Sequence, residues 1–266
     1  MARRVGIIGF GHLGQFLTER VQESPDHELA FVWNRSPEKI REGLPVLEDL
    51  ADAASMTPDL IVEVAHPVVA KRHLASLLGV CDVMAGSPTA FADADTEAAG
   101  RAACTEHGLY VAKGALPGLH DVREMVANGK LHGARIRMTK PPHSLRYSGP
   151  VDLDAITEET MIYDGPVRQL AGWAPNNVNT MCVLAMASEL GFDDVKAELV
   201  VIPDFGFHLV EVELCGPPRA DGKQFKLELK RTNPAAIGAV TGTATYQSFW
   251  RSLQRAEGMG PGVHFV

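Results

Sequence analysis

The sequence predicts an α/β protein, with a doubly wound parallel sheet in its first part and an α+β domain on an open mixed sheet in its second. Residues 4–8 form an apolar run that ends in a glycine-rich turn, and another apolar run follows at 29–33. Apolar runs and helical patterns then alternate up to about residue 115, which is typical of parallel βα units. After that point several segments alternate apolar and polar residues with period two, which indicates half-buried strands.

The individual elements follow from this pattern in chain order. In the first part we expect strands at 4–8, 29–33, 58–65, 81–87 and 109–112, helices at 13–21, 68–78 and 96–108, and short helices or turns near 38–43 and after 46–50. In the second part we expect helices at 118–128, 167–171 and 177–190, and strands at 134–140, 161–163, 195–202, 207–215 and 223–229. The last two strands should form an antiparallel hairpin, because a Gly/Pro-rich turn joins them.

These elements group into two domains and a C-terminal segment. We expect a dinucleotide-binding Rossmann domain at 1–115, a substrate-binding and dimerisation domain at 116–238, and a C-terminal segment at 239–266. Residues 239–254 form a long helical pattern with an apolar face, a candidate to return to the first domain. An open sheet needs cover on its apolar face, so we expect a homodimer built through that face.

The turn after the first strand carries the motif Gly9-x-Gly11-x-x-Gly14. In a dinucleotide site Gly9 makes the turn, Gly11 lets a pyrophosphate approach the backbone, and Gly14 lets helix and strand pack closely. Free N–H groups at the helix start would hold the phosphates. The alternative is a plain glycine turn; the strand-turn-helix context favours the dinucleotide site. The residues of this predicted site are Gly9, Phe10, Gly11, His12, Leu13 and Gly14.

The end of the second strand reads Asn34-Arg35-Ser36, where a carboxylate would be expected for the 2′-hydroxyl of NAD. Asn34 does not repel a 2′-phosphate, Arg35 is able to pair with it, and Ser36 is able to donate a hydrogen bond. The cofactor is therefore NADP or NAD, with NADP favoured. The alternative is that Arg35 is only a solvated loop charge.

Ligands of an open parallel sheet bind beyond the carboxyl ends of its strands. His66 lies at such an end; it either lines the cofactor pocket or is an ordinary loop histidine before proline. Further candidates at these ends are Ala65, Pro67, Ser87 and Ala115.

The second part offers three polar stretches. Asn177 and Asn179 begin a helix, as caps or as contacts to the nicotinamide or substrate. Lys140 ends a strand and either binds a substrate carboxylate or is solvated. His208 lies among apolar residues, which suits a half-buried packing histidine, yet a neutral histidine is also what proton transfer at neutral pH needs.

Composition argues against several classes of function. The 33 acidic and 25 basic residues give a net charge of −8, so we expect neither nucleic acid nor membrane as a partner. The four cysteines lie far apart without a C-x-x-C motif, so we expect neither a metal site nor a disulfide framework. No apolar run reaches membrane-spanning length, and the N-terminus leads directly into a strand, so we expect a cytoplasmic protein.

Several motifs together resemble the L-aspartate dehydrogenases, in particular their animal branch, over essentially the whole chain. The matching stretches are Gly9-Phe10-Gly11-His12-Leu13-Gly14, Val62-Glu63-Val64-Ala65-His66-Pro67, Val111-Ala112-Lys113-Gly114-Ala115-Leu116, Asn177-x-Asn179-Thr180, His208-x-Val210-x-Val212-Glu213-Leu214, and Asn233-Pro234 followed by Gly242-x-Ala244-Thr245. Archaeal members carry Phe-Pro before the asparagines and Asn-Val-Ala-Ala after them, whereas this chain has Ala174-Pro175 and Thr180-Met181-Cys182.

The resemblance implies a homodimeric enzyme that converts L-aspartate reversibly to oxaloacetate and ammonia with NAD(P). His208 would be the catalytic base and would also contact substrate, Ala115 would contact the cofactor, and Asn177 and Asn179 would lie at the nicotinamide. Lys140 is our candidate for one substrate carboxylate. The alternatives are another Rossmann oxidoreductase that acts on a small acid or imine, and a non-enzymatic NADPH-binding sensor.

Overall fold

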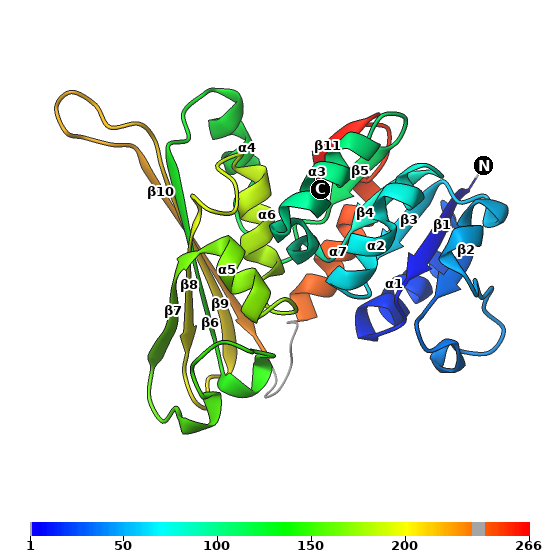
Figure 1. The fold of residues 1–266 in the computed structure, drawn as a ribbon, viewed down its shortest axis with the longest axis horizontal. Coiled ribbons are helices and arrows are strands. Elements are labelled where there is room, and N and C mark those ends of the chain that lie inside the picture. The colour runs from blue at the N-terminus through cyan, green and yellow to red at the C-terminus, as the bar shows by residue number, and fades with distance from the viewer. Residues whose placement is uncertain (1, 236–242) are drawn as a thin grey trace. The chain divides into compact units, whose positions relative to one another are not determined.

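The computed structural model describes residues 2–235 and 243–266 (Figure 1). The chain forms two compact units, Met1–Ala112 together with Tyr246–Val266, and Lys113–Thr245. We call them the first and the second unit and describe each by itself. Within the described residues no helix combines the length and apolarity needed to cross a membrane.

The first unit is built on a six-stranded sheet in which every described pairing is parallel. Its strand order is β11-β5-β4-β3-β1-β2, the doubly wound arrangement predicted from the sequence. The fold class is therefore confirmed. The strands are β1 (Arg3–Ile8), β2 (His27–Trp33), β3 (Leu60–Glu63), β4 (Asp82–Ala85), β5 (Gly108–Val111) and β11 (Gly262–Phe265), and the helices are α1 (His12–Glu23), α2 (Pro67–Leu78), α3 (Ala94–Ala103) and α7 (Thr243–Arg255).

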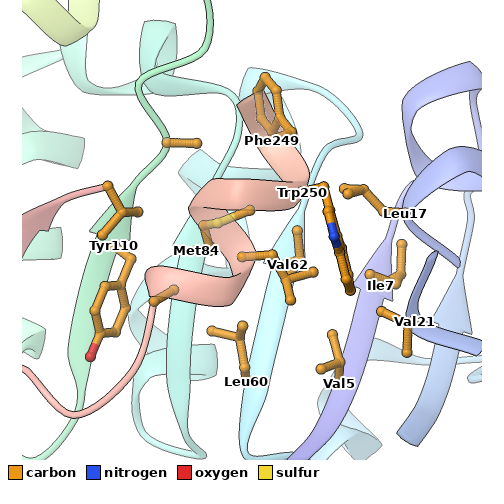
Figure 2. Close-up of a cluster of buried hydrophobic side chains, with 14 residues drawn as sticks. Val5, Ile7, Leu17, Val21, Leu60, Val62, Met84, Tyr110, Phe249 and Trp250 are labelled. Atoms are coloured by element: carbon orange, nitrogen blue, oxygen red, sulfur yellow. The ribbon is translucent and has the colours of Figure 1, made fainter. Parts of the chain in front are cut away.

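The end of the chain belongs to this first unit. In α7, Phe249, Trp250 and Leu253 join the buried cluster that includes Val5 and Leu60 on the sheet (Figure 2). Of the predicted helix at 239–254, residues 239–242 lie outside the described residues, and the described part continues to Arg255. Strand β11 was not predicted, because four residues at the end of a Gly/Pro-rich stretch carry too little periodicity to indicate a strand.

The second unit has a five-stranded sheet of order β10-β9-β6-β8-β7, in which only the β6–β8 pair is parallel. The predicted mixed sheet is confirmed, as is the antiparallel β9–β10 hairpin. The last strand runs further than predicted, to Pro234. The strands are β6 (Gly133–Lys140), β7 (Thr160–Pro166), β8 (Lys196–Val201), β9 (Phe207–Cys215) and β10 (Lys226–Pro234), and the helices are α4 (Leu119–Ala127), α5 (Val167–Trp173) and α6 (Asn179–Ala187).

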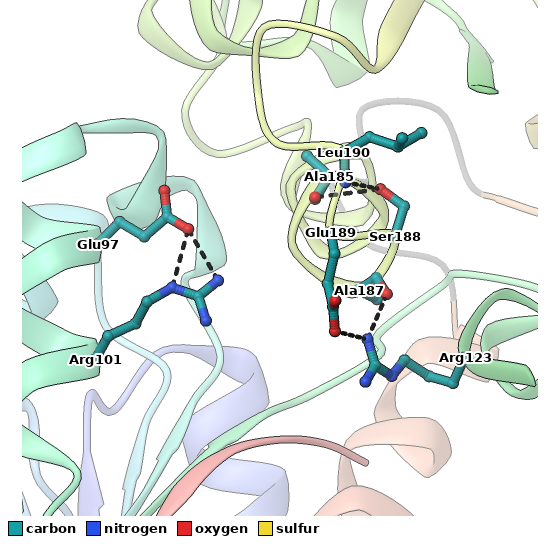
Figure 3. A network of polar contacts seen from close by, with 8 residues as sticks. All are labelled: Glu97, Arg101, Arg123, Ala185, Ala187, Ser188, Glu189 and Leu190. Atoms are coloured by element: carbon teal, nitrogen blue, oxygen red, sulfur yellow. Dashed lines mark hydrogen bonds and ion pairs between the residues drawn. The ribbon is translucent and has the colours of Figure 1, made fainter. Parts of the chain in front are cut away.

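Two helices end earlier than the sequence predicted. In α6 the backbone of Glu189 takes a left-handed conformation with φ 58°, which ends the helix before Gly191. Arg123 of α4 donates to the carbonyl of Ala187 at this end and to the Glu189 carboxylate, both at 2.8 Å (Figure 3). In α3 the helix stops at Ala103, and an Arg101–Glu97 pair spans its last turns.

The two faces of the second sheet differ. On one face, Val210 and Val212 of β9 are buried, and α4, α5 and α6 lie along it (Figure 1). The opposite face carries ion pairs, and Glu198 at its centre is buried. The apolar face is thus covered within the chain, so the need for cover no longer argues for a dimer through that face. The ion pairs are Arg135–Glu198, Arg135–Glu213, Arg137–Glu198, Lys226–Glu213 and Lys230–Glu211.

Candidate functional site

The glycine turn after β1 has the geometry that a dinucleotide site needs. Gly9 has φ +108°, and a Cβ there would lie 2.7 Å from the Cα of Ala65. A Cβ on Gly14 would lie 1.9 Å from the carbonyl oxygen of Gly9. A Cβ on Gly11 would have no atom within 4 Å, so this glycine faces open space. Gly9 and Gly14 are therefore required by the fold, whereas Gly11 keeps the approach to the backbone clear.

The start of α1 suits an anion. Gly11 is its N-cap and supplies no side-chain cap, and the first turn contains no acidic residue. His12 is exposed and Leu13 is half-buried there. The positive end of the helix dipole and the N–H groups of this first turn are thus available to a pyrophosphate. Together with the open space above Gly11, this arrangement fits a dinucleotide cofactor.

Asn34 connects the loop after β2 to this turn. Its side-chain oxygen accepts from the Phe10 amide at 3.2 Å, and its side-chain nitrogen donates to the Ser36 carbonyl at 2.9 Å. The Asn34 amide therefore holds both loops in place rather than pointing an unused group at a ribose. Arg35 is exposed, and no ion pair in the described part of the chain involves it. Its guanidinium is therefore available to a phosphate.

The loops after β3 and β4 lie at the same carboxyl edge of the sheet. His66 is the N-cap of α2, and its Nδ1 accepts from the Val68 amide at 3.2 Å. Pro67 is the first residue of that helix and is buried, whereas Ala65 is exposed. The edge thus brings together all the predicted cofactor residues of the first unit: Gly9, Phe10, Gly11, His12, Leu13, Gly14, Asn34, Arg35, Ser36, Ala65, His66, Pro67 and Ser87.

Glu63, the last residue of β3, was not recognised as a site residue from the sequence. This carboxylate is only 2 % exposed and accepts hydrogen bonds from the loop after β3 and from Ser87 after β4. Burial raises its pKa from 4.5 to about 7, although the hydrogen bonds from Ala65, Ser87 and His66 oppose this shift. The available signal was an acidic residue inside an otherwise apolar strand.

The second unit has a polar row at one end of its apolar face. In β9–β10, His208 lies directly opposite Asn233. In β6–β9, Thr139 lies opposite Leu209, so the next residue, Lys140, is the neighbour of His208 on the same face. Register alone therefore aligns Lys140, His208 and Asn233 across three adjacent strands, and all three are buried.

His208 and Lys140 are unusual for buried residues. His208 is 4 % exposed, and its Nε2 is buried without a hydrogen-bond partner in the described structure. Burial lowers its pKa to about 4, with a smaller contribution from the charge of Lys140. Burial also lowers the pKa of Lys140, to about 8. At neutral pH the site therefore contains a neutral imidazole beside an ammonium group, a combination suited to a proton acceptor near an anion.

Arg231 and Asn233 of β10 were missed by sequence reasoning. Arg231 lies two residues before Asn233, on the same face, and its Nε donates to the Asn233 side-chain oxygen at 3.0 Å. Its Nη1 lies 3.4 Å from the carbonyl oxygen of Gly114. Burial lowers the pKa of Arg231, and none of the described ion pairs includes this residue. A half-buried guanidinium without an acidic partner is a second candidate for binding a carboxylate.

The predicted asparagines have different surroundings. Asn177 is buried, accepts from the Arg146 amide at 2.8 Å and donates to the Ser144 carbonyl at 2.8 Å. It therefore fixes the loop that follows Lys140. Asn179 is half-buried at the first position of α6, and Ala115 is half-buried before α4.

The described residues contain no group of three or more His, Cys, Asp or Glu side chains arranged to hold a metal ion. Four free cysteines are described, and burial raises the thiol pKa of three of them, Cys81, Cys104 and Cys182. These thiols are therefore poor nucleophiles and poor metal ligands.

Comparison with known proteins gives the same organisation. Residues 9–136 match the family model of the NAD-binding domain of homoserine dehydrogenase, and residues 121–252 match that of the C-terminal part of aspartate dehydrogenase. Aspartate dehydrogenase domain-containing proteins of Xenopus tropicalis and Danio rerio are both 42 % identical, over 98 % and 99 % of this chain and 97 % and 98 % of theirs. An L-aspartate dehydrogenase of Acinetobacter baumannii is 25 % identical, over 81 % of this chain and 89 % of its own.

Among solved structures, the aspartate dehydrogenase of Thermotoga maritima has the same fold, with a TM-score of 0.72, 21 % identity, and coverage of 97 % of this chain and 98 % of its own. The strand order and the open glycine turn define a dehydrogenase fold of the class that binds a nicotinamide cofactor. Within that class, the chain belongs to the aspartate dehydrogenase family. The family resemblance drawn from the sequence motifs is thereby confirmed.

Proposed function

We propose that this protein is an NAD(P)-dependent L-aspartate dehydrogenase, which converts L-aspartate reversibly to oxaloacetate and ammonia. The observation that carries the proposal is the buried imidazole of His208, which lies beside Lys140 and whose Nε2 has no hydrogen-bond partner among the described residues. Family membership supports the same reaction. In this proposal the first unit binds the cofactor and the second unit binds the substrate.

The bound cofactor would accept a hydride from the substrate Cα, which leaves iminoaspartate after the amine loses a proton. Water then adds to the imine carbon, and His208 Nε2 takes the proton that this water loses. The resulting imidazolium returns the proton to the nitrogen that leaves as ammonia. A base that is neutral at pH 7 and buried away from bulk water suits both transfers.

Two cations of the second unit match the two carboxylates of aspartate. Lys140 lies next to His208, and we assign it to one carboxylate. Arg231 lies in the next row of the same face, and we assign it to the other. Since both ammonium and guanidinium groups are partly desolvated, their attraction to a carboxylate is stronger than at an open surface.

The cofactor assignment rests on the loop after β2. Arg35 is exposed and available to a 2′-phosphate, and the stretch Asn34-Arg35-Ser36 contains no carboxylate. We therefore propose that NADP(H) binds at least as tightly as NAD(H). We also retain a homodimer and a cytoplasmic location as proposals. Light scattering tests the dimer, because a mass near the 28.7 kDa of one chain at micromolar concentration would contradict it.

The decisive experiment follows the absorbance of NADPH or NADH while the purified protein is mixed with oxaloacetate and ammonia. Oxidation that needs both oxaloacetate and ammonia supports the proposal. Oxidation by oxaloacetate without ammonia would indicate a different oxidoreductase. Tight cofactor binding without any turnover would favour the sensor hypothesis instead.

A further inference from the structure

The carboxylate of Glu63 joins two loops that are separate in sequence. Its Oε1 accepts from the amide of Ala65 at 2.8 Å, from the amide of His66 at 3.0 Å, and from the hydroxyl of Ser87 at 3.1 Å. Its Oε2 accepts from the amide of Ser87 at 3.2 Å. One buried side chain therefore sets the backbone of both loops at the carboxyl edge of the sheet, where a dinucleotide lies in this fold.

Among the described residues, no cation balances this carboxylate. The groups that set its pKa are burial and four hydrogen bonds, and none of them is a charged residue. Its neighbours on the sheet, Ile8 of β1 and Ala85 of β4, are apolar. The nearest titratable group that these contacts bring to it is His66, whose imidazole Nδ1 accepts from the Val68 amide. An ionised Glu63 is thus held by N–H and O–H dipoles alone. Burying a charge in this way lowers the folding stability.

We propose that Glu63 is a positioning residue of the cofactor site, whose ionised form fixes the Ala65–His66 and Ser87 backbones for dinucleotide binding and whose protonation weakens that binding. The proposal rests on the cofactor site proposed above. Its chemical basis is that a carboxylate only accepts hydrogen bonds, whereas a protonated carboxyl group must also donate one. A proton on Oε2 faces the Ser87 N–H, so the link between the two loops is weakened.

The direction of the pH effect follows from the raised pKa. In the cofactor-free protein Glu63 is protonated below about pH 7 and ionised above it. If the cofactor binds the ionised form, its Kd increases as the pH falls below about 7, by at most about tenfold per pH unit. Glu63→Gln has nearly the same shape as the protonated form and does not titrate. The variant should therefore match the wild type at about pH 6 or below and bind more weakly above about pH 8.

Thermal stability separates positioning from a purely structural role. Between pH 4.5 and about 7 the folded protein holds a proton on Glu63 that the unfolded chain lacks. Folding stability contributed by this group therefore decreases as the pH rises through that range, and an ionised Glu63 is unfavourable above it. Glu63→Gln should then keep or increase the melting temperature at about pH 8 while it weakens cofactor binding. A structural residue would lower both.

The test is a fluorescence titration of NADPH and of NADH into the wild type, Glu63→Gln and Ser87→Ala, from about pH 6 to about pH 9. At about pH 8 we expect Glu63→Gln to raise the Kd roughly tenfold or more, as for the loss of a hydrogen bond to a charged group. Ser87→Ala keeps the carboxylate and its backbone bonds, so it should retain the wild-type pH profile. The 2′-phosphate of NADPH titrates in the same way with every variant, so its contribution cancels in the ratio of the wild-type Kd to the variant Kd. Glu97→Gln on α3 serves as a control outside both loops.

The outcomes are distinct. A Glu63→Gln protein with the wild-type Kd and pH profile would overturn the inference while the cofactor site stands. An equal loss of affinity at every pH, together with a lower melting temperature, would also overturn it and indicate a structural role. If the wild type binds neither NADPH nor NADH, the proposed cofactor site fails, and the inference fails with it.

Discussion

Lys140 and His208 are neighbours on adjacent strands of the second sheet, and their side chains lie on the same buried face. Burial, and to a smaller extent the ammonium of Lys140, lowers the pKa of the His208 imidazole to about 4. At neutral pH the pair therefore carries one positive charge, on the ammonium of Lys140, beside a neutral imidazole. A dianionic substrate would restore balance at this place, since its carboxylates favour the protonated form of both groups.

Replacing His208 by Ala should reduce turnover roughly 10²–10⁴-fold, the usual effect of removing a general base. Cofactor affinity should stay nearly unchanged, because His208 belongs to the second unit and the dinucleotide motif to the first. Turnover and melting temperature should be measured on the same sample. A variant that is less stable but fully active per folded molecule would make His208 a packing residue.

The pH profiles provide an independent check of the same residue. Because kcat/KM reports groups of the free enzyme, His208 should affect it only near pH 4, so this imidazole causes no change between about pH 6 and 8. A bound dicarboxylate raises the imidazole pKa, so the corresponding step in kcat should lie at a higher pH than the step in kcat/KM. Saturating cofactor removes the effect of Glu63 on cofactor binding, and under that condition a step in kcat/KM for the substrate close to the ordinary histidine pKa would contradict the buried, neutral state of His208.

Lys140→Met should abolish a pH-dependent binding step above neutrality. Since the pKa of Lys140 in the free protein is about 8, its ammonium is present below that pH and is lost above it. Succinate, a dicarboxylate that cannot react, isolates this effect from the titration of the aspartate amine. Its inhibition constant should increase above about pH 8 in the wild type and should be high and constant in the variant. A pH-independent constant in the wild type would remove Lys140 from the carboxylate site.

Arg231→Met should reduce the preference for oxaloacetate over pyruvate, which lacks the second carboxylate. Losing a charge-assisted hydrogen bond to a buried cation should lower kcat/KM for the dicarboxylate roughly 10- to 100-fold, with little change in kcat/KM for pyruvate. Lys230→Met is a matched control, because Lys230 is the adjacent residue on the opposite face and pairs with Glu211. If both variants behave like the wild type, Arg231 does not contact the substrate.

Trp250→Ala should destabilise the first unit by about 3–5 kcal/mol, the usual cost of removing a buried tryptophan. Trp250 lies in the cluster between α7 and the sheet, and the guanidinium carbon of Arg20 is 5.5 Å from its ring (Figure 2). Chemical denaturation measures the loss, and Arg251→Ala on the exposed side of α7 is the control. An unchanged midpoint would mean that α7 is not part of this unit's cooperative core.

The glycine turn was predictable because Gly9 and Gly14 are required by their own local geometry. The positive φ of Gly9 and the close contact of Gly14 with the preceding turn arise within one βα unit. The register of the second sheet was not predictable, because it depends on residues up to about a hundred positions apart. The alternation of β9 placed His208 on a face, but only pairing with β10 brings Asn233 beside it.

The same distinction explains what was missed at the site. A sequence cannot show that the amide of Asn34 is already used by Phe10 and Ser36, or that Asn177 holds the loop at Ser144. Nor can it show that Glu63 has four donors and no cation among the described residues, since the donors come from the loop after β4 as well as from the loop after its own strand. The sequence therefore predicts which residue types lie at the site and roughly where they lie. It does not predict which of their hydrogen-bonding groups are already used or which charges are buried.

Asn34→Asp should shift cofactor preference from NADPH towards NADH. The new carboxylate can still accept from the Phe10 amide, but it loses the donor to the Ser36 carbonyl and adds a negative charge beside Arg35. That charge repels a 2′-phosphate and is able to accept from a 2′-hydroxyl, so the ratio of the two Kd values should change by roughly tenfold or more. Asn34→Ala removes both loop contacts without a charge and should weaken both cofactors equally. Arg35→Ala should weaken NADPH alone. Fluorescence titration of both cofactors into all three variants separates these effects, and a wild type that strongly prefers NADH would refute our interpretation of the loop.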